Sequence, residues 1–133
     1  MKLERIAESF SICKLENGSG IRLDEPFCFV GRTDEELSLV CPTRVAPQSV
    51  IARDDGWKAV RIAGELDFSL IGVLSGLTAV LAENGVGVFA VSTFNTDYIF
   101  VKEARYEEAL AALAQAGYEI AGQTDGCAPQ NAR

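Results

Sequence analysis

The sequence predicts an α+β fold of two tandem βαββαβ subdomains with antiparallel sheets, the first copy having lost its helices. Three observations lead to this prediction. Apolar and polar residues alternate in several short runs, two segments of the second half change to a helical period, and the hairpin pattern of the first half recurs in the second. A chain of 133 residues is long enough for one compact domain or two very small ones.

The composition of the chain argues against several classes of binding partner and against the commonest kinds of catalysis. The 12 Lys and Arg against 19 Asp and Glu give a net charge of −7, which argues against nucleic acid and against a membrane surface. The absence of histidine removes the commonest general base and metal ligand, so we expect no metal, no cofactor and no catalysis. No signal peptide is evident, and Cys13, Cys28, Cys41 and Cys127 lack metal-binding spacing, so we expect a reducing cytoplasmic location.

The first half of the chain predicts strands and turns. The expected elements are, in order, a strand over 5–15, a turn over 16–20, a hairpin with strands over 27–30 and 37–40, and an irregular stretch over 45–52. Asn17 and Gly18 favour the first turn because both tolerate positive φ. Pro42 ends the hairpin because proline cannot donate to a neighbouring strand. Residues 1–55 are the predicted N-terminal subdomain.

The second half predicts the order strand, helix, two strands, helix and strand. The expected elements are a turn over 54–56, a strand over 57–63, a helix from Ser69 to Asn84, strands over 86–91 and 97–102, a helix over 105–116 and a strand over 118–121. Ser69 is the expected N-cap, and Asn84-Gly85 the left-handed end, of the first helix. This order is the ferredoxin-like pattern, so residues 56–122 are the predicted C-terminal domain, and 123–133 a flexible tail.

A shift of 61 positions superposes the two predicted hairpins. Residues 29–40 then lie over residues 90–101, with low identity but the same apolar–polar–apolar contour. We interpret this agreement as a degenerate tandem repeat of one βαββαβ unit.

The segment 64–73 carries the first group of candidate ligand-binding residues, Asp67, Ser69, Gly72 and Val73. A strand ends there, and a glycine lies within the first turn of the next helix. The unpaired N–H groups of a helix start suit a carboxylate, and Gly72 permits close approach of a ligand. The alternative is that Asp67 or Ser69 only caps the helix and Gly72 eases its packing.

The segment 92–97 carries the second group, Thr93, Asn95 and Asp97. It joins two strands and is dense in hydroxyl, amide and carboxylate groups, which also favour a plain hairpin turn. The functional interpretation is that Thr93 and Asp97 hold an ammonium or guanidinium group. A site that uses both segments is expected to be completed by another subdomain or subunit.

Residues 66–74 and 85–101 resemble an ACT domain, and more narrowly the small bacterial tandem-ACT proteins related to the CASTOR arginine sensors. In that group an aspartate-to-glycine turn precedes the first helix, and an S-T-[FY]-x-T-D stretch, here 92–97, links the middle strands. Residues 29–42 of the first half also resemble this group, although the second half carries the similarity most strongly.

The resemblance implies a βαββαβ fold with helices on one sheet face and an amino acid bound at an interface between ACT units. It implies that Gly72 and Val73 offer backbone groups to the ligand, and that Thr93 and Asp97 contact its polar or cationic end. Ile71 stands where many ACT domains have a proline, a departure that the narrower group shares.

The expected function is therefore non-catalytic: a regulatory homodimer that binds an amino acid or a related metabolite. One alternative is a structural or interaction module that dimerises or docks on a partner enzyme without a ligand. The other is a small thiol- or carboxylate-dependent enzyme using Cys41 or Asp97, which the absence of histidine disfavours.

Overall fold

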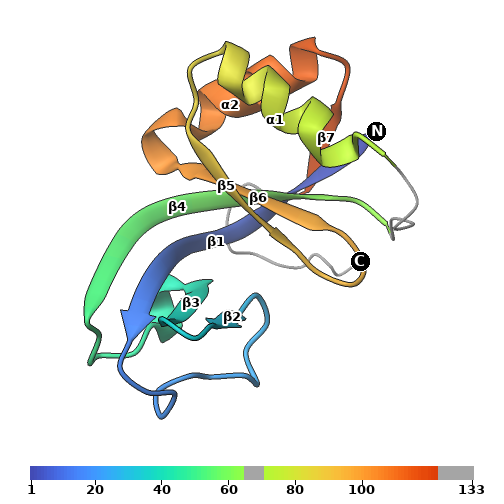
Figure 1. The fold of residues 1–133 in the computed structure, drawn as a ribbon. Coiled ribbons are helices and arrows are strands. Elements are labelled where there is room, and N and C mark those ends of the chain that lie inside the picture. The colour runs from blue at the N-terminus through green and yellow to red at the C-terminus, as the bar shows by residue number, and fades with distance from the viewer. Residues whose placement is uncertain (65–70, 123–133) are drawn as a thin grey trace. The chain divides into compact units, whose positions relative to one another are not determined.

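The computed structural model describes residues 1–64 and 71–122 (Figure 1). The elements are β1 (Lys2–Leu15), β2 (Phe29–Arg32), β3 (Leu37–Pro42), the 3-10 turn η1 (Thr43–Val45), β4 (Ala52–Ile62), α1 (Val73–Glu83), β5 (Val88–Ser92), β6 (Asp97–Lys102), the 3-10 turn η2 (Glu103–Arg105), α2 (Tyr106–Gln115) and β7 (Glu119–Gly122). Most bounds differ from the predicted ones by one to three residues, which is the usual uncertainty at element ends.

The chain forms two compact units, and β1 and β4 contribute one end to each. Unit 1 comprises Met1–Ala7 and the chain from Lys58 onward, and unit 2 comprises Glu8–Trp57. The strand order is β7-β1-β4-β6-β5 in unit 1 and β2-β3-β1-β4 in unit 2. None of the helices in the described part of the chain is long and apolar enough to cross a membrane.

In unit 1, both helices cover one face of the sheet (Figure 1). Strands β5 and β6 are antiparallel, and the elements from β4 to β7 follow the predicted βαββαβ order. The apolar stripes of the helices pack on inward-facing strand residues, because each amphipathic element must bury its apolar side. The core is formed by Leu3, Val60, Ile62, Leu77, Leu81, Val86, Ile99, Val101, Tyr106, Ala109, Leu110 and Leu113. The predicted α+β, ferredoxin-like fold class is confirmed.

The beginning of β1 lies in the sheet of unit 1, between β4 and β7. Residues Lys2–Arg5 pair in parallel with Glu119–Gly122, and the Ala63 N–H donates to the Lys2 carbonyl at 2.9 Å. The predicted division at residues 55 and 56 assigned this segment to the N-terminal subdomain. No feature of the sequence separates residues 2–5 from the rest of β1, because β1 is one uninterrupted strand. Their place in unit 1 could therefore not be predicted.

Unit 2 is a four-stranded sheet without an α-helix in its residues 8–57, all of which the structure describes. Its β1–β3 and β2–β3 pairs are antiparallel. One face of the sheet carries a small core of Cys13, Leu15, Leu37, Leu39 and Cys41. Loop residues cover this core where helices cover the sheet of unit 1, namely Ile21, Cys28, Val45, Ala46 and Val50.

The two hairpins are equivalent at a shift of 60 positions, so the predicted shift of 61 is wrong. Arg32 pairs with Leu37 at the end of one hairpin, and Ser92 pairs with Asp97 at the end of the other. The 3-10 turns η1 and η2 follow at the same offset. A slip of one residue exchanges the two faces of a strand, and a contour of short apolar runs does not detect it.

The turn predicted over 54–56 is also wrong, because these residues continue β4. Gly56 has a φ of 84°, which glycine adopts without strain. The Asp55 carboxylate accepts hydrogen bonds from the Ser11 hydroxyl at 2.5 Å and from Arg53 Nε at 2.7 Å. Bonds to the neighbouring strand therefore override the local turn preference of Asp-Asp-Gly.

Candidate functional site

The segment 92–97 forms a tight turn between β5 and β6 that is attached to the end of β4. The Thr93 N–H and hydroxyl both donate to the Thr96 carbonyl, at 2.8 Å and 3.0 Å. The Thr96 hydroxyl is buried and donates to the Ile62 carbonyl at 2.7 Å. The turn is thus fixed beside the end of β4, from which the chain leads on to α1.

Asp97 begins β6 and is half-buried, whereas Asn95 is exposed at the tip of the turn. The Ser92 hydroxyl donates to the Asp97 carboxylate at 2.6 Å, and the two residues are paired across the hairpin. An ionised carboxylate accepts about four hydrogen bonds. Asp97 therefore has the capacity to accept a cationic donor from a ligand as well.

Helix α1 begins at Val73, and its N-cap is Gly72 with a φ of 81°. Among residues 1–64 and 71–122 no side-chain hydrogen bond caps this helix, and its first turn has no acidic residue. Its first N–H groups therefore keep the partial positive charge that attracts an anion. The prediction of Ser69 as N-cap is wrong, because the left-handed glycine sets the start of the helix.

The structure describes five of the seven predicted site residues. Thr93, Asn95 and Asp97 lie together in one turn, and Gly72 and Val73 lie at the start of α1. Asp67 and Ser69 lie outside the described residues. They belong to the connection between β4 and α1, so the union of the two segments in one site stays a prediction.

Sequence reasoning missed four residues around these segments. Ser92 and Thr96 hold the turn in shape through their side-chain hydrogen bonds to Asp97 and to the Ile62 carbonyl. Ile71 and Phe94 are large apolar side chains with exposed fractions of 95% and 81%. No feature of the sequence indicated that Thr96 attaches the turn 92–97 to the end of β4.

Thr96→Val is expected to lower the free energy of unfolding by about 1–3 kcal/mol, because the Ile62 carbonyl loses its buried hydroxyl partner. Urea denaturation measures the loss. The control is Thr78→Val, whose hydroxyl bonds carbonyl groups of its own helix; we expect a change within about 0.5 kcal/mol there. Equal losses for the two variants would remove Thr96 as the anchor of the turn.

The thiol of Cys41 does not suit a catalytic role. Cys41 is fully buried, and this burial raises its pKa to about 12. Because the thiolate is the reactive form of cysteine, Cys41 is protonated and inert near neutral pH. Within residues 1–64 and 71–122, no three His, Cys, Asp or Glu side chains are grouped to hold a metal ion.

Stability is expected to fall as the pH rises from about 9 to about 12. Burial raises the pKa of Cys41 from 9.0 and that of Tyr106 from 10.0, each to about 12. Above pH 9–10 the unfolded chain releases these protons while the folded chain keeps them, so unfolding becomes easier. Melting curves from pH 8 to 11 check this. Tyr106→Phe should flatten the decline above pH 10, and an unchanged slope would exclude Tyr106 as a cause.

Comparison with known proteins identifies relatives of the whole chain. The ACT domain family model matches residues 52–115. No curated protein sequence matches the chain. Among solved structures, protein Atu0741 from Agrobacterium tumefaciens is 30% identical, the match covers 96% of this chain and 97% of that one, and the TM-score is 0.82.

Two more distant structures show the fold alone. VC0802 from Vibrio cholerae, a protein of unknown function described as a possible transport protein, is 22% identical over 84% of this chain and 85% of its own, with a TM-score of 0.66. The ligand-free regulatory subunit of aspartate kinase from Thermus thermophilus is 14% identical over 86% of this chain and 96% of its own, with a TM-score of 0.60. The chain belongs to the same family as Atu0741, and its residues 52–115 are an ACT domain.

Proposed function

We propose that the chain is a non-catalytic regulatory protein whose unit 1 binds an amino acid. ACT domains are regulatory modules that bind small molecules, and the match of residues 52–115 to this family supports the proposal. The observation that carries the proposal is the start of α1 at a left-handed Gly72, which has no side chain of its own to cap the helix. Such a start offers backbone N–H groups to the carboxylate that every amino acid has.

The turn 92–97 supplies the complementary chemistry. Asp97 and Thr93 accept hydrogen bonds from an ammonium or guanidinium group, and a charged partner strengthens such bonds. We propose Gly72, Val73, Thr93, Asn95 and Asp97 as ligand contacts. Asp67 and Ser69, outside the described residues, complete the proposed set. The resemblance to CASTOR-related proteins makes arginine one ligand to test.

We further propose that the ligand lies at an ACT–ACT interface of a homodimer. Strand β5 is an edge of the unit 1 sheet, and residues 84–96 around it contain no charged side chain. Exposed sheet edges usually carry charged side chains, which prevent pairing with another chain. Arg32 is such a side chain on the edge strand β2. Pairing through β5 would bring a second copy next to the turn 92–97.

Unit 2 is, in this proposal, a degenerate ACT-like copy. Without the inserted beginning of β1, the strand order of unit 1 is β7-β4-β6-β5. The strands of unit 2, listed from the other end as β4-β1-β3-β2, have the same order. The equivalence of the hairpins at a shift of 60 supports the same relation. The free thiols Cys13, Cys28 and Cys41 are consistent with the cytoplasmic location that we propose.

Asp97→Ala is expected to abolish the rise in melting temperature that a bound amino acid produces. A ligand at a hundred times its Kd stabilises by about 2.7 kcal/mol, so a screen of the standard amino acids at millimolar concentration detects binding. Asp34→Ala, in the turn of the unit 2 hairpin, is the matched control and should leave the response intact. A full response in Asp97→Ala would remove Asp97 from the site.

The exposure of Ile71 and Phe94 favours a second candidate, an interaction module that docks on a partner enzyme without a ligand. Both side chains flank the proposed site, and apolar groups of this size anchor protein interfaces. No thermal response to any amino acid, together with co-purification of a stoichiometric partner, would support this candidate against the first.

A further inference from the structure

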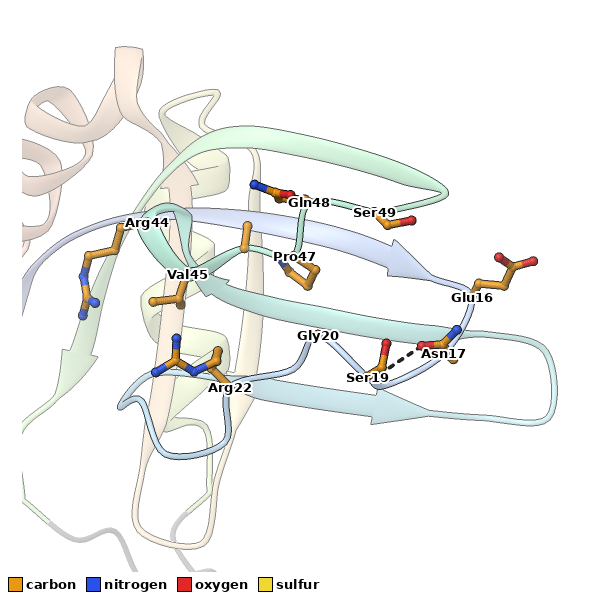
Figure 2. Close-up of a pocket in the computed structure, with 11 residues that line it drawn as sticks. Glu16, Asn17, Ser19, Gly20, Arg22, Arg44, Val45, Pro47, Gln48 and Ser49 are labelled. Carbon is orange, nitrogen blue, oxygen red and sulfur yellow. Dashed lines mark hydrogen bonds between the residues drawn. The ribbon is translucent and has the colours of Figure 1, made fainter.

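Unit 2 contains a pocket of about 430 Å³. It lies between the loop 16–22 and the loop 44–49 (Figure 2). The first loop follows β1 as α1 follows β4. The second loop begins within η1 and continues after it, in the chain position that α2 has after η2. The volume is within the range of small-molecule sites, which is about 300–1,000 Å³. Unit 2 thus holds a ligand-sized space between two loops that stand, in chain order, where unit 1 has its helices.

The loops around the pocket are held in shape. A Cβ atom on Gly20 would lie 2.9 Å from Pro47 Cβ, so the two loops touch at a place where only glycine fits. The Asn17 side-chain oxygen accepts a hydrogen bond from the Ser19 N–H at 3.0 Å. The Ala46 N–H donates to the Thr43 carbonyl at 3.2 Å. The pocket thus has a preformed wall on each side.

The two ends of the pocket differ in charge. Arg22 and Arg44 lie at one end, and Glu16 and Asn17 lie at the other (Figure 2). The amide of Gln48 and the hydroxyls of the lining serines lie between them. This pattern is complementary to a molecule with an anionic group at one end and a cationic group at the other.

The arginines at the cationic end differ in how firmly they are held. Arg44 is fixed by Glu8 at 2.9 Å and by Glu25 at 3.1 Å. Arg22 reaches Asp24 only at 3.4 Å and Glu25 at 3.7 Å, and 53% of its side chain is exposed. Because exposed ion pairs contribute little, Arg22 can exchange these partners for the carboxylate of a ligand. The three carboxylates around the arginines disfavour a dianion.

We propose that this pocket is a second ligand site, which binds a small dipolar metabolite with its carboxylate on Arg22 and its amino group near Glu16. The proposal goes beyond the amino-acid site of unit 1, because every residue that lines the pocket belongs to unit 2. The two sites can therefore succeed or fail separately.

The test is amide NMR of the isotope-labelled full chain with three six-carbon probes: aminocaproate, adipate and hexamethylenediamine. Aminocaproate, which carries both charges, should shift the amide signals of 16–22 and 44–49. Adipate and the diamine should bind roughly tenfold more weakly, because each lacks one charged partner. Arg22→Gln and Glu16→Gln should each weaken aminocaproate binding roughly tenfold. Arg32→Gln, an exposed arginine outside the pocket, is the control and should bind normally.

Four outcomes would overturn the proposal. The first is the absence of shifts in both loops with all three probes at tens of millimolar. The second is binding of adipate or the diamine as tightly as aminocaproate. The third is a loss in Arg22→Gln no greater than in Arg32→Gln. Shifts confined to 72–76 and 92–97 would likewise exclude the pocket, while leaving the unit 1 site in place. Unchanged amide signals of β3 residues 39–42, which do not pair with Arg32, verify that unit 2 of each variant is folded.

Discussion

Replacing Leu77 by alanine is expected to lower the free energy of unfolding by about 2–5 kcal/mol. Leu77 has no exposed surface and lies on α1, where it packs in the core of unit 1 with Val60, Ile62 and Leu81. The substitution removes apolar burial and leaves a cavity that the close-packed neighbours fill only in part. Urea denaturation followed by circular dichroism measures this loss.

Leu74→Ala is the matched control for this prediction. Leu74 is on the same helix and contacts the same core but is only partly buried. The same substitution should therefore cost less, about 1 kcal/mol. If both variants lose the same stability, α1 does not pack on the sheet with Leu77 at the centre of the contact.

Gly122→Ala is expected to cost about 2–4 kcal/mol, from an unfavourable backbone conformation together with a steric conflict. Gly122 has a φ of 102°, and a Cβ atom there would lie 3.0 Å from both the N and the O atoms of Arg5. These are backbone atoms of the paired strand β1, so no side chain can turn away. The substitution should weaken the parallel β1–β7 pair, with faster amide exchange over residues 2–5.

Two other glycines separate the causes of this loss. Gly56 has a φ of 84° with nothing near its Cβ position, so Gly56→Ala should cost only the conformational part, about 1–2 kcal/mol. Gly87 has neither restriction, and Gly87→Ala should change stability by less than about 1 kcal/mol. A loss at Gly122 no larger than the loss at Gly56 would contradict the close contact with β1.

The sequence predicts the order of elements well where periodicity is strong. Strand β6 lies at the predicted residues 97–102, because its apolar run is bounded by polar turn residues. The insertion of residues 2–5 beside β7 escapes prediction, since parallel pairing with a strand so far away leaves no local pattern. The turn over 54–56 fails for a related reason: its local preference is overridden by partners on β1.

The candidate sites were predictable to different degrees. The turn 92–97 is visible in the sequence, because hydroxyl, amide and carboxylate residues gather between two apolar runs. The start of α1 at Gly72 is not, since a left-handed N-cap has no side chain to mark it. The pocket of unit 2 leaves no motif either, because its charged ends come from two separate loops that contain no repeat or known spacing.

We propose that unit 1 binds an amino acid through the start of α1 and the turn 92–97. The most direct measurement is the mapping of amide NMR shifts during titration with the standard amino acids, arginine included. The account predicts saturable shifts over 72–76 and 92–97 with at least one of them, and their loss in Asp97→Ala. No saturable shift with any amino acid, or shifts confined to other parts of the chain, would contradict it.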